Sequence, residues 1–128
     1  MKVSQFSSGN MKILIVDDSP RMRGLIIKML NDGNNEFFEC KDGWDAFSSY
    51  VKIQPDVVIM DINMKKMNGL DSAYQILSQF SDAIIIMITN FNEPIYRRRA
   101  EISGIKHYIL KDNLTNLKDI IMKYDSDK

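Results

Sequence analysis

The sequence contains a single cysteine, Cys40, and a single histidine, His107. One cysteine cannot form a disulfide within the chain, and we expect it to be a small buried side chain of a cytoplasmic protein. A structural zinc site is excluded because no cluster of cysteine and histidine exists. The lone histidine is predicted to lie at the surface, as neither a metal ligand nor a phosphoacceptor.

Long apolar runs and an excess of one charge are also absent. The longest apolar run, residues 83–88, is far too short to cross a bilayer. Residues 1–10 have no apolar core of the kind that marks a secretory signal. The 17 lysines and arginines equal the 17 aspartates and glutamates in number, so the net charge is zero. We therefore expect neither a membrane nor nucleic acid as a direct partner.

What the 128 residues do contain is an alternation of apolar and amphipathic segments. The apolar segments predict five short strands, at 12–16, 36–40, 56–60, 83–88 and 107–110. Ser19 and Pro20 are a good helix start, and apolar residues follow at steps of three and four. Further helices are predicted at 43–53, 69–80, 93–103 and 114–124. Alternation of this kind predicts an α/β fold, a parallel sheet with helices on both faces.

The chain is long enough for one domain with its own core. The strands at 12–16, 56–60 and 83–88 are apolar without alternation, which is typical of central strands covered on both faces. The mixed segments 36–40 and 107–110 are therefore placed at the edges. The expected organisation is a flexible N-terminal tail at 1–10, a domain at 11–124 and a C-terminal tail at 125–128.

Polar side chains follow four of the predicted strands. Asp17 and Asp18 follow the first, Asp61 the third, Thr89 the fourth and Lys111 the fifth. Ligands of open α/β sheets bind outside the carboxyl ends of the strands, near the point where the strand order reverses. We therefore expect these five side chains to converge at one end of the sheet.

Three carboxylates in one cleft repel each other, and a divalent cation removes the conflict. Oxygen ligands without sulfur or imidazole suit Mg²⁺, which keeps waters and accepts phosphate oxygens. A metal ion, an ammonium and a hydroxyl together are the parts needed for phosphoryl transfer, and a carboxylate can itself be the nucleophile. Asp17 and Asp18 are accordingly interpreted as holders of the cation.

The motifs also carry a resemblance to a known family. The segments "VDDS" (16–19), "DINMKKMNG" (61–69), "MITN" (87–90) and "YILK" (108–111) occur in the order and approximate spacing of response-regulator receiver domains. The resemblance covers residues 11–124. It implies a flavodoxin-like, doubly wound (βα)5 fold with a parallel sheet of strand order 2-1-3-4-5, and a role in two-component signal transduction.

The resemblance implies roles for the acidic residues. Asp61 would be the phosphoacceptor, the nucleophile that takes a phosphoryl group from a histidine kinase or a histidine phosphotransfer protein. Asp18 and Asp61 would bind Mg²⁺ directly, with Mn²⁺ as a possible substitute, and Asp17 would bind it mainly through water. The backbone carbonyl of Asn63 would supply another oxygen.

The resemblance likewise implies how the signal leaves the site. Lys111 would pair with phosphoryl oxygens, Thr89 would swing its hydroxyl towards the phosphate, and Tyr108 would be the aromatic whose rotamer reports activation. The output would be a changed surface over residues 91–124, which binds a downstream protein or a second copy of the chain. The chain is either a standalone regulator or the receiver part of a longer one.

Three positions depart from the family pattern. Lys65 and Asp112 stand where proline is usual, and the bond after Lys111 should therefore be trans. Asn90 stands where alanine or glycine is usual. Asn63 and Asn90 are predicted to modulate access to the phosphoryl site, with Asn90 slowing both phosphotransfer and hydrolysis.

Other classes of function remain open at this stage. One is a phosphorylation-independent interaction domain, an alternative that the three departures from the family pattern leave open. Another is a phosphatase with an aspartate nucleophile, disfavoured because Asn63 replaces the carboxylate needed as acid and base two residues on. On the leading interpretation the chain is a signalling domain and not an enzyme, and it catalyses only its own phosphorylation and dephosphorylation. The arginine run 97–99 is read as a solvated helix face, with a contact surface for an acidic partner as the rival interpretation.

Overall fold

The computed structural model describes residues 11–125, which form five strands and five α-helices in strict alternation. The strands are β1 (Lys12–Val16), β2 (Glu36–Cys40), β3 (Val57–Asp61), β4 (Ile85–Thr89) and β5 (His107–Leu110). The helices are α1 (Pro20–Leu30), α2 (Ala46–Ile53), α3 (Gly69–Gln79), α4 (Pro94–Ile102) and α5 (Asn116–Asp125), with a short 3₁₀ turn at Lys111–Asn113. Within this part of the chain, no helix has the length and apolar character required to span a membrane.

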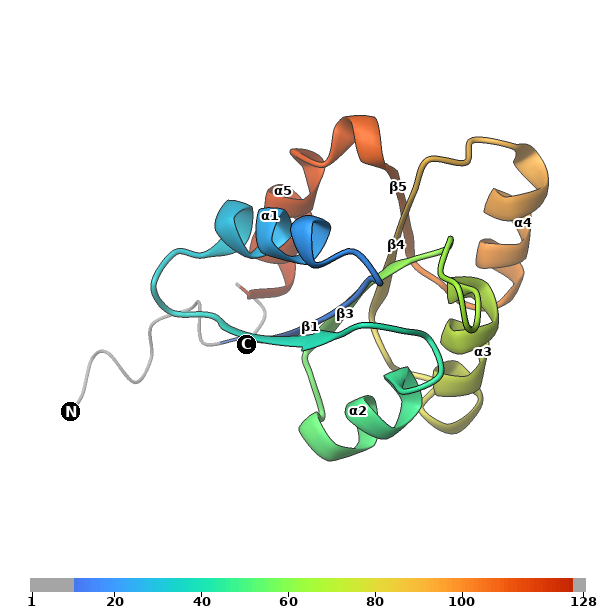
Figure 1. The fold of residues 1–128 in the computed structure, drawn as a ribbon, viewed down its shortest axis with the longest axis horizontal. Helices are drawn as coiled ribbons and strands as arrows, with labels where there is room; N and C mark the ends of the chain where they lie inside the picture. The colour runs from blue at the N-terminus through green and yellow to red at the C-terminus, as the bar shows by residue number, and fades with distance from the viewer. Residues whose placement is uncertain (1–10, 126–128) are drawn as a thin grey trace.

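All five strands are parallel and lie in the order β2-β1-β3-β4-β5, which confirms the predicted flavodoxin-like fold. Helices α1 and α5 cover one face of the sheet, and α2, α3 and α4 lie on the other (Figure 1). From β1 the chain runs outward to the edge strand β2 and then returns past β1 to β3. The strand order therefore reverses between β1 and β3. Val16 pairs with Met60, so Asp17 and Asp61 stand side by side at this switch point.

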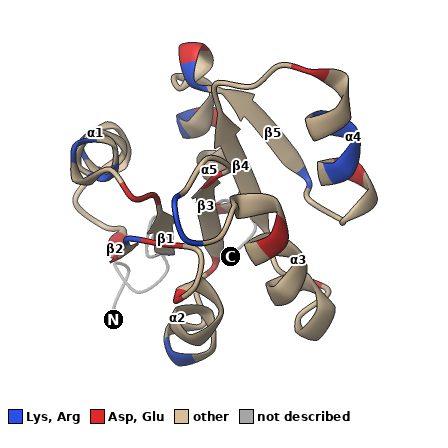
Figure 2. Cartoon of the chain, turned by 45° about the vertical axis from the view of Figure 1, so that its right-hand side comes forward, with Lys and Arg blue, Asp and Glu red and all other residues tan. Residues whose placement is uncertain are grey.

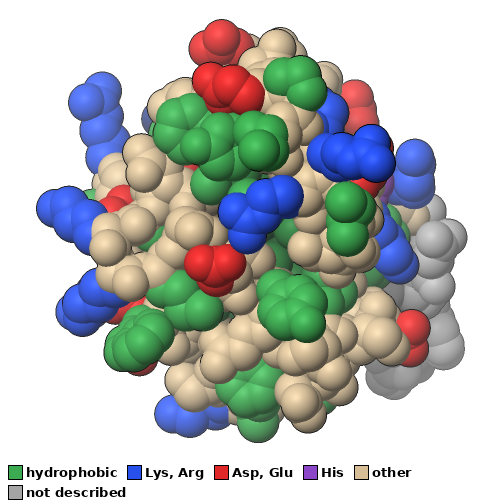
Figure 3. Space-filling view, turned by 90° about the vertical axis from the view of Figure 1, so that its right-hand side faces the viewer, with side chains coloured by type: hydrophobic (Ala, Val, Ile, Leu, Met, Phe, Trp, Pro, Cys, Tyr) green, Lys and Arg blue, Asp and Glu red, His purple; other side chains and the backbone are tan. Residues whose placement is uncertain are grey.

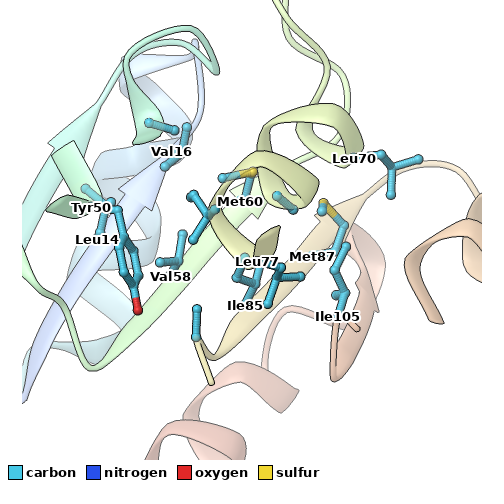
Figure 4. Packing of buried hydrophobic residues seen from close by; sticks show 14 of the residues in the cluster. Leu14, Val16, Tyr50, Val58, Met60, Leu70, Leu77, Ile85, Met87 and Ile105 are labelled. Atoms are coloured by element: carbon cyan, nitrogen blue, oxygen red, sulfur yellow. The ribbon is translucent and has the colours of Figure 1, made fainter. Parts of the chain in front are cut away.

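Two apolar clusters, one on each face, hold the helices on the sheet. The larger one packs strand residues such as Leu14, Val58 and Met87 against α2 and α3, with Tyr50 and Leu77 among the helix residues (Figure 4). The central strands β1, β3 and β4 are buried on both faces, as their unbroken apolar sequences predict. The edge strands β2 and β5 are only partly buried.

Local sequence signals explain most element boundaries. The Ser19 hydroxyl accepts a hydrogen bond from the Met22 amide and caps α1, and Pro20 occupies the first turn. Asn68 caps α3 in the same way through the Asp71 amide. Gly104 ends the turn after α4 at φ +91°, a backbone conformation that residues with a Cβ rarely adopt.

The structure corrects several predicted boundaries. Strand β3 includes Asp61 itself, and α2 begins at Ala46 rather than at residue 43, because the segment before it forms a turn. The last helix runs to Asp125, one residue into the predicted tail. His107 is half-buried rather than on the surface, and its Nε2 lies 2.6 Å from the Tyr124 hydroxyl. The predicted tail at 1–10 and the rest of the predicted tail at 125–128 lie outside the described residues.

Candidate phosphoryl and metal site

The five predicted side chains come from the carboxyl ends of four neighbouring strands. Asp17 and Asp18 directly follow β1, Asp61 is the last residue of β3, and Thr89 is the last residue of β4. Lys111 directly follows β5 and opens the 3₁₀ turn. Because the strands are parallel, these ends meet at a single edge of the sheet.

The three carboxylates form one acidic cluster. Asp17, Asp18 and Asp61 each offer one oxygen, and these oxygens all lie within 4.8 Å of one another. Asp17 is fully buried and Asp61 is only 3% exposed. The turn into α1 shapes the cluster, since Oδ1 of Asp17 accepts a hydrogen bond of 2.9 Å from the amide of Ser19.

Lys111 is the cation that faces this cluster. Its Nζ lies 3.4 Å from Oδ1 of Asp61 and 3.8 Å from Oδ2 of Asp17. Neither of these two oxygens accepts a hydrogen bond, although both are buried. One ammonium thus serves two buried carboxylates, and the site carries an excess of negative charge.

The excess charge shows in the proton affinity of the carboxylates. Burial, reinforced by the neighbouring charge of Asp17, raises the pKa of Asp61 to about 6, and Lys111 opposes this only in part. Burial also raises the pKa of Asp17, against the opposing effects of the Ser19 amide and Lys111. A divalent cation would stabilise both groups in their ionised forms.

The donor set fits Mg²⁺. All candidate ligands are oxygen atoms, two of the buried carboxylate oxygens lack hydrogen bonds, and three carboxylates contribute to the cluster. Asn63, whose carbonyl is the predicted further ligand, lies in the loop after β3, and its side chain is exposed. The same ligand set suits Mn²⁺.

Thr89 and Tyr108 are linked through the backbone of one residue, Phe91. The Thr89 side chain is fully buried, and its Oγ1 accepts a 3.0 Å hydrogen bond from the Phe91 amide. The Tyr108 hydroxyl donates a 2.7 Å hydrogen bond to the Phe91 carbonyl. On the outer side, the Arg97 guanidinium lies 4.5 Å from the centre of the Tyr108 ring. The hydroxyl of Thr89 is therefore connected to α4 through Phe91, Tyr108 and Arg97.

The positions that depart from the family pattern lie around this edge of the sheet. Lys65 lies in the loop between β3 and α3, and Lys65, Asn90 and Asp112 are all exposed. Asn63, the other residue predicted to modulate access, is exposed as well. No peptide bond among the described residues is cis, so the bond from Lys111 to Asp112 is trans, as predicted. The effect of Asn63 and Asn90 on access stays a prediction.

Two residues that sequence reasoning missed support the site. A Cβ built on Gly69 would overlap the backbone carbonyl of Asp61, so α3 can begin against the acceptor only with glycine at this position. Its position inside the first turn of a helix, where glycine is costly, was the available signal. Arg23 donates a 2.6 Å hydrogen bond to the Asp17 carbonyl and pairs with Glu39 at 2.9 Å. Nothing in the sequence distinguished Arg23 from the other basic residues of α1.

Comparisons with known proteins point to one family. The family model "response regulator receiver domain" matches residues 13–122. A chemotaxis protein CheY of Listeria monocytogenes is 33% identical over 102 residues, which are 79% of this chain and 86% of the relative. The transcriptional regulatory protein DesR of Bacillus subtilis is 36% identical over 103 residues, 79% of this chain and 51% of that protein.

Solved structures agree in fold. The response regulator protein TrrA of Thermotoga maritima, solved in complex with Mg(2+)-BeF, superposes with a TM-score of 0.79 at 30% sequence identity. The alignment covers 89% of this chain and 98% of that one.

Proposed function

The chain belongs to the response regulator receiver domain family, and from this premise we propose that it is switched by Mg²⁺-dependent phosphorylation of Asp61. Receiver domains of this family act in two-component signalling, with histidine kinases upstream and effectors downstream. The phosphoryl donor proposed here is a histidine kinase or a histidine phosphotransfer protein. The single cysteine, free and buried, supports a cytoplasmic location.

The observation that carries the proposal is the environment of the Asp61 carboxylate. Its Oδ1 is buried, accepts no hydrogen bond and lies 3.4 Å from the ammonium of Lys111. With a pKa of about 6, this carboxylate is mostly ionised at neutral pH and can act as a nucleophile. A structural carboxylate would be expected to have its hydrogen bonds satisfied.

In the proposed step a carboxylate oxygen of Asp61 forms a bond to phosphorus. The bond between phosphorus and the donor nitrogen breaks, and its electron pair stays on the imidazole, which leaves. Lys111 offsets negative charge on the phosphoryl oxygens, and Thr89 can turn its hydroxyl from the Phe91 amide towards one of them. Asp18, Asp61 and the Asn63 carbonyl would hold Mg²⁺ directly and Asp17 mainly through water, and the ion would supply neutralisation of charge on the phosphoryl group.

We propose that the output surface comprises residues 91–124. Arg97 and Tyr108 connect Thr89 to α4, where exposed Ile95 and Ile102 flank the arginine run. The basic residues of α4 appear in blue in Figure 2, and hydrophobic and basic side chains lie next to each other on the face that Figure 3 presents. A new dianionic group at Asp61 would shift the population between two arrangements of this surface, which a downstream protein or a second copy reads.

The relatives include a protein that the matched residues nearly span and a protein about twice as long. The chain spans 86% of the Listeria CheY but only 51% of DesR. We propose that the same phosphorylation switch operates in either setting. The partner bound by residues 91–124 would then be a separate protein, a second copy or a linked output domain.

The test is incubation with Mg²⁺ and acetyl phosphate, followed by mass spectrometry of the intact protein. We expect one added phosphoryl group, which is lost on chelation of Mg²⁺ and absent in Asp61→Asn. Unmodified protein under conditions that saturate with Mg²⁺ would favour a phosphorylation-independent interaction domain. Sustained turnover of phosphate esters would instead favour a phosphatase.

A further inference from the structure

A hydrogen bond joins two segments that flank the site without belonging to it. The hydroxyl of Ser72, in the first turns of α3, donates to the backbone carbonyl of Gly43 at 2.9 Å, and both residues are buried. Gly43 lies in the turn between β2 and α2, residues 41–45, which we call the β2–α2 turn. The bond links this turn to the helix that follows the Asp61 loop, residues 62–68.

The same turn touches the Asp61 loop directly. A Cβ built on Gly43 would lie 2.6 Å from the carbonyl oxygen of Met67 and 3.2 Å from Cε of Met64. The first distance is shorter than any real contact of a Cβ, and the obstructing atom belongs to the backbone. The two backbones can therefore approach this closely only because residue 43 has no side chain.

A buried carboxylate completes the contact. Asp42 is 4% exposed, its Oδ1 accepts a 2.9 Å hydrogen bond from the Asp45 amide, and its Oδ2 lies 3.6 Å from Nζ of Lys66. The bond to Asp45 fixes the shape of the β2–α2 turn, whereas the pair with Lys66 connects it to the Asp61 loop. Lys66 is itself largely exposed, so this pair is the weakest of the three contacts.

The Asp61 loop is thus held at two places. At its end, Gly69 packs on the Asp61 carbonyl, and the Gly69 amide donates a 2.8 Å hydrogen bond to the Ile62 carbonyl. At Met67, the β2–α2 turn lies close against the loop backbone, and the same turn accepts the hydrogen bond from Ser72. Lys65 stands in this loop where the family usually has proline, which would fix the backbone locally. Contacts from neighbouring segments are therefore more important for holding this loop in place.

We propose that Gly43 and Ser72 are positioning residues for the metal and phosphoryl site, an inference that rests on the proposed function of Asp61. They hold the Asp61 loop so that the Asp61 carboxylate and the Asn63 carbonyl stay in reach of Asp17 and Asp18. Mg²⁺ demands near-ideal octahedral geometry, so a small displacement of the loop weakens the shared site. Neither residue touches the reacting atoms.

The first variant is Ser72→Ala, which removes the donor to Gly43 and adds no atoms. Its matched control is Ser78→Ala on the same helix, where the hydroxyl bonds only to the Gln75 carbonyl at an exposed position. Ser72 bonds to Gly43 and not to a metal ligand, so we expect Ser72→Ala to weaken Mg²⁺ binding by no more than about tenfold, the lower end of the effect of removing a hydrogen-bond partner of a ligand. Isothermal titration with Mg²⁺ alone measures this, and Ser78→Ala should match the wild type.

A second readout separates positioning from general loss of stability. The Mg²⁺ concentration that half-saturates phosphorylation should rise in Ser72→Ala, while the rate at saturating Mg²⁺ stays near that of the wild type. A purely structural role would lower the melting temperature and leave the half-saturating concentration unchanged, and that result would overturn the proposal. Gly43→Ala should shift Mg²⁺ affinity in the same direction.

An exposed pair of lysines keeps the test valid if the buried variants fail to fold. Lys66→Met removes the contact to Asp42, and Lys65→Met removes a neighbouring exposed charge from the same loop. We expect Lys66→Met to bind Mg²⁺ more weakly than Lys65→Met, and equal affinities would contradict the inference. If wild type binds Mg²⁺ but is never phosphorylated, the proposed function fails while these affinity comparisons still decide the positioning role.

Discussion

The ammonium of Lys111 lies 3.4 Å from Oδ1 of Asp61, across the interval between β5 and β3. The same ammonium lies 3.8 Å from Oδ2 of Asp17, so it is shared by two buried carboxylates that accept no hydrogen bonds there. This relationship connects the first, third and fifth strands at one point. It predicts that the stability of the protein and its chemistry depend on the same few charges.

Replacing Lys111 should expose this dependence. Lys111→Met leaves two buried carboxylates without their cation, and we expect a loss of roughly 1–3 kcal/mol in the free energy of unfolding at neutral pH without divalent ions. Uptake of a proton by Asp61 keeps the loss below the full value for a broken buried pair. Chemical denaturation measures it, and Lys118→Met, an exposed lysine on α5, is the control. Equal losses in the two variants would contradict the pairing.

The raised pKa of Asp61 predicts a pH dependence in metal-free protein. Between its ordinary value of 3.8 and about 6, the folded state keeps a proton that the unfolded state has lost. The free energy of unfolding should therefore fall as pH rises through this window and level off above it. Asp61→Asn should flatten the curve and should be more stable than wild type above the window, by up to about 3 kcal/mol for a shift of this size.

Denaturation in the presence of a chelator, at several pH values, checks this expectation. The matched control is Asp82→Asn, an exposed carboxylate in the turn after α3. It should keep the slope of the wild type. A wild-type curve that rises through the same window would show that the carboxylate is stabilised rather than penalised by its surroundings.

Addition of Mg²⁺ should reverse the penalty. A ligand that binds only the folded state stabilises it by about 2.7 kcal/mol at a hundred times its dissociation constant. We expect the melting temperature to rise with Mg²⁺ concentration in wild type and much less in Asp18→Asn, which removes a ligand of the acidic cluster. Asp82→Asn again serves as the control, and an equal rise in all three proteins would place the ion elsewhere.

Asn90 offers a test of access to the site. Its side chain is exposed directly after Thr89, so Asn90→Ala should speed both phosphorylation and hydrolysis a few-fold, equivalent to about 1 kcal/mol in activation free energy. Phosphorylation and decay rates measured by mass spectrometry check this. Asn34→Ala, in the exposed loop at the amino end of β2, should change neither rate, and unchanged rates in Asn90→Ala would refute the access role.

Most of the fold was readable from the sequence because its signals are local. The unbroken apolar runs identified the central strands, and the cap at Ser19 placed the start of α1. The start of α2 was missed because Asp42 bonds the Asp45 amide and holds a turn that helix periodicity cannot reveal. The segment 43–53 has helical spacing throughout its sequence, although its first residues belong to the turn in the structure.

In the site, as in the fold, local features could be predicted from the sequence and contacts between separate segments could not. The convergence of Asp17, Asp18, Asp61 and Lys111 was predicted from their positions at the ends of strands, and the structure brings these four side chains together, while their roles stay predictions. The contacts of Gly43 and Ser72 were not predicted, because they join segments far apart in the sequence, and the contact of Gly69 with Asp61 depends on the path of the loop between them. Such contacts can be identified only once the strand order and the paths of the loops are known.

The most direct test of the central claim is the identity of the residue that becomes phosphorylated. Borohydride reduces an aspartyl phosphate to homoserine, so treatment after reaction with acetyl phosphate and Mg²⁺ marks the acceptor for peptide mapping. We predict homoserine at position 61 and unchanged aspartate at 17 and 18. Homoserine at 17 or 18, or phosphorylation that survives in Asp61→Asn, would contradict it.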